Sequence, residues 1–109
     1  MKAIAILSHD RSQNLPALAS AHEQGLTNFD ASTWFAIFFP KGTPIAIVKK
    51  LNDAIVATME TRAVQDRLKE IGLTIVEPNR RSSEYLQKFV ESEIAKWAVP
   101  IRSSGVSLD

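Results

Sequence analysis

Residues 34–51 read WFAIFFPKGTPIAIVKKL, and this stretch decides the fold class because a strand-like run leads directly into a helix. From 29 to 39, aromatic and β-branched side chains occupy both parities, which in the second half is typical of a strand buried on both faces. The turn residues Pro40 to Pro44 end the run. Thr43 is predicted to be the N-cap of the next helix and Pro44 its first residue.

Three helices are predicted after this turn, because apolar residues recur at intervals of three or four. Their stripes are Val48, Leu51, Ile55 and Met59; Val64, Leu68 and Ile71; and Leu86, Val90, Ile94, Trp97 and Ile101. Thr61 is expected to cap the second helix and Gly72 to end it. The third begins at Ser82 or Ser83.

Pro100 lies inside the third predicted helix. Proline has no backbone N–H to donate to the carbonyl of Lys96, and its ring clashes with the preceding turn. We therefore expect this helix to kink or end near Val99.

The remaining segments predict an alternation of strands and helices. Residues 2–8 form a short Ile-rich run that suits a buried strand, residues 16–24 a short helix ended by Gly25, and residues 73–76 a strand ended by Pro78. The predicted order is β-α-β-α-α-β-α. This alternation indicates an α/β fold with parallel strands.

Composition narrows the class of protein. The chain has 109 residues, a net charge of +1 and 45% hydrophobic residues, which predicts one soluble packed unit and no nucleic-acid binding by bulk charge. It contains no cysteine, which excludes thiol catalysis and disulfides. Its apolar runs are too short to span a membrane. No export signal is recognised, because His9, Asp10 and Arg11 interrupt the first apolar run.

Catalytic and metal-binding patterns are weak. Ser8, His9 and Asp10 are the residue types of a hydrolytic triad, but consecutive side chains at a strand end diverge. No metal site or cofactor is expected, because neither His9 nor His22 shares a ligand spacing with a carboxylate cluster, and no glycine pattern would cradle phosphate. The chain is expected not to be an enzyme.

Small hydroxyl residues beside the aromatic run are the more open candidates. Ser32 and Thr33 could bind a carboxylate or simply pair with backbone, and the residues leave both alternatives open. The neighbouring aromatic side chains, among them Trp34, could line a pocket, although burial in a core is the commoner role of strand aromatics.

Short strings recur in a fixed order along the chain: Ser8-His9-Asp10-Arg11-Ser12, Leu15-Pro16, Glu23, Gly25-Leu26, Phe29, Trp34-Phe35, Phe39 to Pro44, Val48 to Asn52, Val64 to Leu68 with Gly72, Glu93 to Trp97, Ile101-Arg102, Gly105 and Leu108-Asp109. This ordered set resembles one family, the Bug-type extracytoplasmic solute receptors of tripartite tricarboxylate transporters. The resemblance covers essentially the whole chain, and it is to the C-terminal part of these receptors only.

The resemblance implies the C-terminal portion of a bilobed, periplasmic-binding-protein-like (type II) fold. Residues 1–32 would be a partial second-lobe segment, residues 33–39 the strand that crosses the hinge, and residues 40–109 a partial first-lobe segment. Such receptors are periplasmic, bind small organic carboxylates in the cleft between the lobes and deliver them to membrane transporter components. Alone, this part of a receptor is expected to bind ligand poorly. If Met1 is the true start, the chain is instead expected to be cytoplasmic.

Within this frame, Ser8, Ser32, Thr33 and Trp34 are the candidate ligand-binding residues. Ser8 follows a predicted strand, and α/β sheets bind ligands beyond the carboxyl ends of their strands. The other three adjoin the implied crossing between lobes. The alternative function is a stand-alone interaction module without a small-molecule ligand, in which a homo-oligomer covers exposed strand edges.

Overall fold

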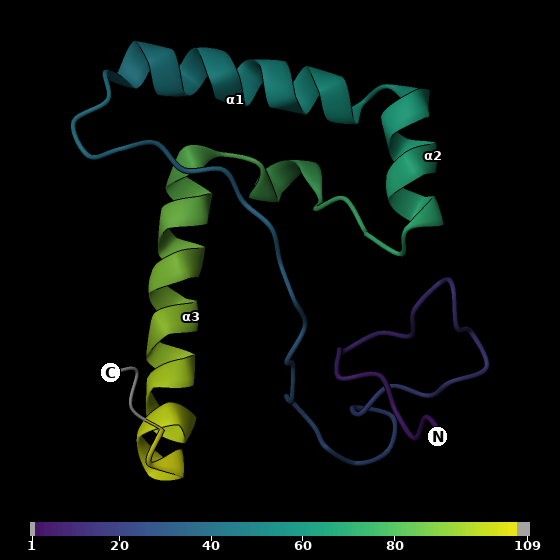
Figure 1. Cartoon of the computed structure of the whole chain (residues 1–109). Coiled ribbons are helices and arrows are strands. Elements are labelled where there is room, and N and C mark those ends of the chain that lie inside the picture. The colour runs from purple at the N-terminus through teal and green to yellow at the C-terminus, as the bar shows by residue number, and fades with distance from the viewer. Residues whose placement is uncertain (1, 107–109) are drawn as a thin grey trace. The chain divides into compact units, whose positions relative to one another are not determined.

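The computed structural model describes residues 2–106 and divides into two compact units. Unit 1 comprises the chain up to Phe39 together with Asp66–Thr74, and unit 2 comprises Pro40–Gln65 and the chain from Ile75 onward. The elements are helix α1 (Ile45–Met59), helix α2 (Arg62–Glu70), the 3₁₀ helix η1 (Pro78–Arg80) and helix α3 (Ser83–Ser104) (Figure 1). The boundary between the units falls within α2.

None of the three predicted β-strands forms a regular strand within residues 2–106. Residues 2–8 form a single parallel bridge, between Ile6 and Ser20, and neither 29–39 nor 73–76 is a strand. A strand needs a neighbour that accepts and donates a series of backbone hydrogen bonds, whereas segments 2–8 and 29–39 share a single one, from Ala31 N–H to Leu7 O at 2.9 Å. The predicted order of elements is therefore wrong in its strands.

The predicted helix at 16–24 is also wrong, because the structure forms successive turns there. The Gln24 N–H does reach the Ser20 carbonyl at 3.2 Å, but this closes only one helical turn. Gly25 follows with φ +97°, the left-handed conformation that the sequence predicted. One turn is too short to gain the cooperative stabilisation of a longer helix.

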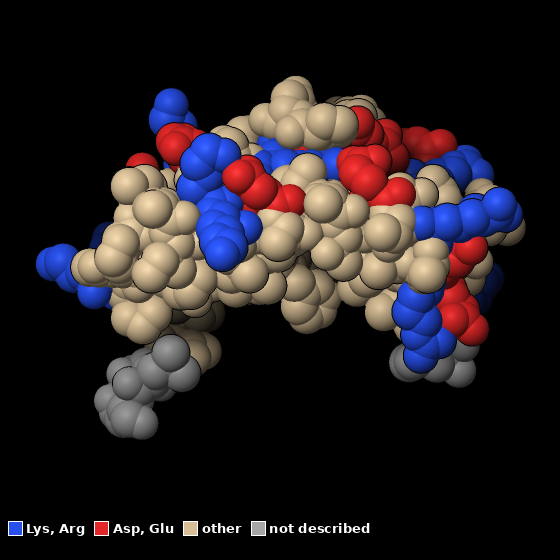
Figure 2. Space-filling view, turned by 90° about the horizontal axis from the view of Figure 1, so that it is seen from above, with Lys and Arg blue, Asp and Glu red and all other residues tan. Residues whose placement is uncertain are grey.

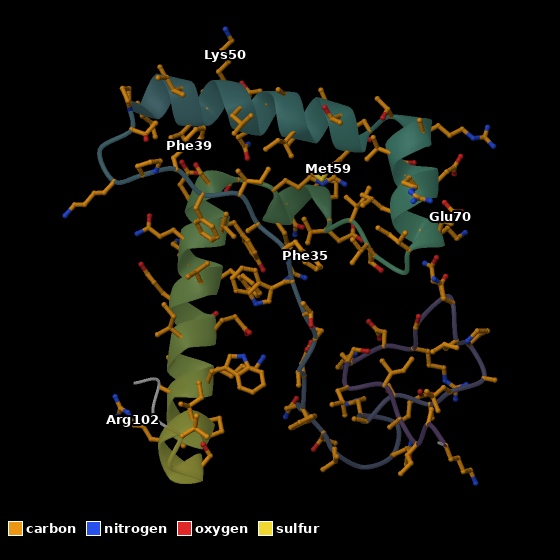
Figure 3. All side chains as sticks on the ribbon, viewed as in Figure 1. Phe35, Phe39, Lys50, Met59, Glu70 and Arg102 are labelled. Atoms are coloured by element: carbon orange, nitrogen blue, oxygen red, sulfur yellow. The ribbon has the colours of Figure 1, made fainter. Side chains whose placement is uncertain are left out.

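Helix α1 confirms the prediction for its apolar stripe. Val48, Leu51, Ile55 and Met59 are all half-buried. In Figure 3, Lys50 points to the opposite side of α1 from Met59. The start differs by one residue, since Pro44 is the N-cap and its carbonyl accepts from Ile47 N–H at 2.9 Å.

Thr43 does not cap α1, which corrects the sequence prediction. Its hydroxyl donates to the carbonyl of Pro40 at 2.8 Å and so stabilises the preceding turn. Thr61 immediately precedes α2, and its hydroxyl likewise donates backward, to the carbonyl of Thr58 at 2.7 Å. No side-chain hydrogen bond caps the start of α1, and the hydroxyls of Thr43 and Thr61 are both bonded to carbonyls of the preceding turns.

The C-terminal end of α2 agrees with the prediction. Gly72 has φ +79°, and its N–H donates to Lys69 O at 3.0 Å while Leu73 N–H donates to Leu68 O at 2.8 Å. These paired bonds are those of a Schellman-type helix end. The Asn14 side-chain amide also donates to Lys69 O, at 3.2 Å, and thereby attaches the N-terminal part of unit 1 to this helix end.

Helix α3 begins beside α1 and runs away from it within unit 2 (Figure 1). Ser82 is its N-cap, with a hydroxyl that accepts from Tyr85 N–H at 3.0 Å. The predicted end near Val99 is wrong, because the helix continues past Pro100 to Ser104. Pro100 and Lys96 are exposed, so water can solvate the carbonyl that proline leaves without its helical donor.

The predicted buried stripe of α3 holds only over its first half. Leu86 and Val90 are half-buried, whereas Ile94, Trp97 and Ile101 are exposed. The start of α3 runs beside α1 (Figure 1). The apolar period continues along α3, but among the described residues of unit 2 no second helix lies beside its C-terminal half (Figure 1).

Candidate functional site

The candidate ligand-binding residues all belong to unit 1, and a backbone hydrogen bond brings two of the segments together. Ala31 N–H donates to the carbonyl of Leu7 at 2.9 Å. Ser8 and Ser32 are the residues that directly follow this pair. The structure thus places Ser8 beside the segment that carries Ser32, Thr33 and Trp34, although they are far apart in sequence.

The hydroxyls of the two serines both make local hydrogen bonds. Ser8 Oγ donates to Asp10 O at 2.7 Å. Ser32 donates twice to one oxygen of Asp30, from its backbone N–H at 2.8 Å and from its hydroxyl at 2.5 Å. The donors of Ser32 therefore already converge on a carboxylate oxygen, the chemical group that a small organic acid would present.

The four candidate residues differ in exposure. Ser8 is half-buried, Ser32 and Thr33 are exposed, and the Trp34 residue is 38% exposed. A carboxylate could approach the hydroxyls of Ser32 and Thr33 from solvent.

The segment after Ser8 is fixed by an ion pair that sequence reasoning did not assign. Arg11 Nε lies 3.0 Å from Glu23 Oε1 and 2.8 Å from Oε2, and Arg11 Nη1 donates to Pro16 O at 2.9 Å. The hydrogen bond from Arg11, followed by that from the Ser20 backbone, lowers the pKa of Glu23 to about 2. The Glu23 hydrogen bond and charge raise the pKa of Arg11.

Ser20 and Glu23 form reciprocal hydrogen bonds. Ser20 N–H donates to Glu23 Oε2 at 2.8 Å, and Glu23 N–H donates to Ser20 Oγ at 3.2 Å. This is the capping-box pattern, in which a serine and a glutamate three residues later satisfy each other's backbone donors. The signal Ser20-Ala21-His22-Glu23 was present in the sequence and would have identified this turn.

The residues of a hydrolytic triad are near one another but are not arranged as one. Ser8 Oγ donates to the carbonyl of Asp10 rather than to a histidine, and His9 Nδ1 lies 3.0 Å from Asp10 Oδ1. The His9 ring stacks on His22, with centroids 4.2 Å apart. Over residues 2–106 no cluster of three or more His, Asp or Glu side chains could hold a metal ion.

Charge on the surface is mixed. Figure 2 shows Lys and Arg side chains interspersed with Asp and Glu on the face that it displays. On α1, for example, Lys49 Nζ lies 2.7 Å from Asp53 Oδ2. No helix within residues 2–106 is long and apolar enough to cross a membrane.

Comparison with known proteins gives a consistent result. Residues 1–106 match the model of the family described as tripartite tricarboxylate transporter family receptor. The chain is 36% identical to protein BugT of Bordetella pertussis over 99% of its own length and 32% of that protein. It spans about a third of the length of this and other curated relatives.

Two solved structures share the fold at more than 30% identity. MatC from Rhodopseudomonas palustris, determined with bound malate, has a TM-score of 0.78 and 34% identity over 88% of this chain and 33% of the other. The periplasmic binding protein BugD has a TM-score of 0.81 and 32% identity over 97% of this chain and 35% of the other. The chain therefore follows the path of part of a periplasmic binding protein, which confirms the predicted fold family although its strands are not formed here.

Proposed function

Because the chain belongs to the tripartite tricarboxylate transporter receptor family, we propose that it supplies one part of a non-catalytic site that binds a small organic carboxylate. The observation that carries the proposal is the family match over residues 1–106, supported by the likeness to a malate-bound structure. The function of the whole receptor would be to present this ligand to transporter components in the membrane, from the periplasm.

The chemistry of unit 1 suits recognition by neutral donors. Arg11 directs its Nε toward Glu23 and its Nη1 toward Pro16 O, so its charge is already compensated within the unit. Ser8, Ser32 and Thr33 carry hydroxyls; in the structure the Ser8 hydroxyl donates to Asp10 O, and the Ser32 hydroxyl and N–H donate to Asp30, so a ligand carboxylate would replace these acceptors. Hydrogen bonds from such donors to an ionised acceptor are among the stronger ones in proteins.

The proposal assigns Ser32 and Ser8 as carboxylate donors, with Thr33 and Trp34 beside them. A ligand carboxylate would take the position at Ser32 that the Asp30 oxygen occupies in the structure. The proposal keeps residues 1–32 as part of one lobe, 33–39 as the crossing and 40–109 as part of the other.

Calorimetric titration of the 109-residue chain with malate, and then with other di- and tricarboxylic acids, tests the proposal. Ser32→Ala and Ser8→Ala are each expected to weaken binding roughly 10- to 100-fold, the effect of removing a hydrogen bond to a charged group. Ser92→Ala is the matched control, since its hydroxyl donates to Phe89 O on α3. Absence of saturable binding to every carboxylate would overturn the assignment of a carboxylate site to this chain by itself.

A second candidate function rests on exposed apolar side chains. Phe35 is 77%, Ile37 62% and Phe38 61% exposed, and within residues 2–106 the backbone of 35–39 makes no backbone–backbone hydrogen bond. Such a segment is a template for strand pairing. In this alternative, a second copy of the chain covers the segment, and the protein acts as a homo-oligomeric interaction module.

Light scattering over a range of concentrations separates the two candidates. The interaction module is supported if the wild-type chain is a compact dimer that does not bind carboxylates and the Phe38→Lys variant has the mass of a monomer. A monomer at all concentrations contradicts it. Lys50→Glu, on the side of α1 opposite Met59, is a control that should leave the mass unchanged (Figure 3).

A further inference from the structure

We infer that Arg11 and Glu23 are positioning residues of the candidate site, because their ion pair closes the loop between Ile6 and Ala19, which contains Ser8, and holds Ser8 beside the segment of Ser32. The positioning role rests on the proposed function, whereas the ion pair and the loop that it closes are present without any ligand. Neither residue touches the donors assigned to the carboxylate.

The loop is defined by hydrogen bonds at its two ends. Ile6 N–H donates to Ala19 O at 3.1 Å, and Ala21 N–H donates to Ile6 O at 2.8 Å. The two ends of the loop, Ile6 and the return point at residues 19–21, are therefore hydrogen bonded to each other. Ser20 and Ala21, the fully buried residues within 2–106, lie at this return point.

The Arg11–Glu23 pair closes the loop a second time. Arg11 binds Glu23, which follows the return point, and also Pro16 O, within the loop itself. Glu23 is in turn fixed by Ser20 N–H at 2.8 Å. The pair therefore links Arg11 to Pro16 within the loop and, through Glu23, to the buried Ser20. These links restrict the conformations open to Ser8, near the start of the loop.

Exposure alone would argue that the pair contributes little. The side chains of Arg11 and Glu23 are 47% and 41% exposed, and isolated exposed ion pairs contribute little to stability. This pair differs because both carboxylate oxygens face Arg11 Nε and because each partner makes a further hydrogen bond to backbone. Geometry of this kind gives a surface ion pair a defined orientation.

Positioning acts on the site through Leu7. Leu7 O accepts from Ala31 N–H at 2.9 Å, and Leu7 lies between Ile6, which holds the return point, and Ser8. If the loop opens, the carbonyl of Leu7 loses its fixed direction and the hydrogen bond to Ala31 weakens. Ser8 and Ser32 would then separate, although neither is itself changed.

Amide hydrogen exchange on the full 109-residue chain tests the inference without ligand. Glu23→Gln keeps an oxygen acceptor for Ser20 N–H but loses the charge, and Arg11→Lys keeps the charge but loses the planar group that also reaches Pro16 O. Each variant is expected to accelerate amide exchange at Ala21 and Ala31 about tenfold, because a charge-assisted hydrogen bond that opposes local unfolding of the loop is lost.

Two controls show that a change is local. Glu70→Gln removes the pair that Arg67 Nη1 forms with Glu70 at 2.5 Å and should leave exchange at Ala21 and Ala31 unchanged. Exchange of the α1 amides in unit 2 should be the same in all variants, which shows that unit 2 is still folded. Unchanged exchange at Ala31 in both Glu23→Gln and Arg11→Lys would overturn the inference.

Malate titration of the same variants separates this inference from the proposed function. Weaker malate binding by Glu23→Gln than by the wild-type chain, which added salt does not restore, supports both the positioning role and the proposed function. Accelerated exchange with unchanged malate affinity would overturn the positioning role. Accelerated exchange in a chain whose wild-type form binds no carboxylate would overturn the assignment of a carboxylate site to this chain by itself and support the geometry inferred for the loop.

Discussion

The backbone N–H of Ala31 donates to the carbonyl oxygen of Leu7 at 2.9 Å and joins two segments of unit 1 that are distant in sequence. This contact lies immediately before Ser8 on one segment and Ser32 on the other. Side-chain periodicity carries no information about it, because both groups belong to the backbone. It is the feature of the structure on which the proposed carboxylate site depends.

The ionisation of Glu23 provides the first prediction. Its pKa is lowered from 4.5 to about 2, chiefly by the hydrogen bond from Arg11. Because the folded-state pKa lies below the unfolded value, ionised Glu23 stabilises the fold above about pH 4.5, and this contribution is lost as the pH falls toward 2. An NMR titration of the Glu23 carboxyl carbon measures the shift.

In Arg11→Ala the pKa of Glu23 should rise toward 4.5, because the largest cause of the lowering is gone. Arg67→Ala removes a different arginine–glutamate pair and should leave the Glu23 titration as it is. A wild-type midpoint near 4.5 would show that the pair does not form in solution.

Gly72 is predicted to be sensitive to substitution for two reasons. Its φ of +79° disfavours any side chain, and a Cβ atom there would lie 3.3 Å from the Asn14 side-chain nitrogen. Gly72→Ala should lower the free energy of unfolding by about 1–2 kcal/mol from the backbone alone. Gly42→Ala is the matched control, since its φ is +88° but nothing lies near its Cβ.

Urea denaturation of both glycine variants measures the comparison. A larger loss for Gly72→Ala than for Gly42→Ala would report the disturbed bond between Asn14 and Lys69 O. Equal losses would show that Asn14 moves aside freely and that only the backbone conformation matters.

The start of α3 offers a third prediction, between adjacent serines. Ser82 Oγ accepts from Tyr85 N–H, whereas Ser83 is the first helical residue. Ser82→Ala should therefore lower the free energy of unfolding by about 0.5–2 kcal/mol, the usual effect of losing an N-cap. Thermal unfolding followed by circular dichroism measures it. A larger loss for Ser83→Ala would reverse the assignment.

Pro100 gives a prediction of opposite sign. It lies inside α3 and cannot donate to Lys96 O. Pro100→Ala restores this donor, so the free energy of unfolding should rise, by up to about 3 kcal/mol. Helical circular dichroism should increase at the same time. A loss of stability would mean that the rigid ring of Pro100 stabilises α3 more than the missing hydrogen bond weakens it.

The sequence by itself determined the three helices after the turn at 40–44 and the family. The intervals of Val48, Leu51, Ile55 and Met59, a serine cap at 82 or 83 and the helix end at Gly72 are local properties, since each depends on residues within one or two turns. The strings at 8–12 and 39–44 indicated the receptor family, which the match over residues 1–106 confirms. The lobe boundaries and the ligand-binding residues stay predictions.

Only the tertiary structure decided which of these patterns are used. The strand-like run at 29–39 forms no strand, because a strand is completed by hydrogen bonds from a neighbour that its own side chains do not specify. Ile94 and Ile101 continue the apolar period of α3 yet stay exposed, because burial depends on what packs against a face. The Arg11–Glu23 pair and the Leu7–Ala31 bond likewise join residues whose proximity is set by the path of the chain rather than by local sequence.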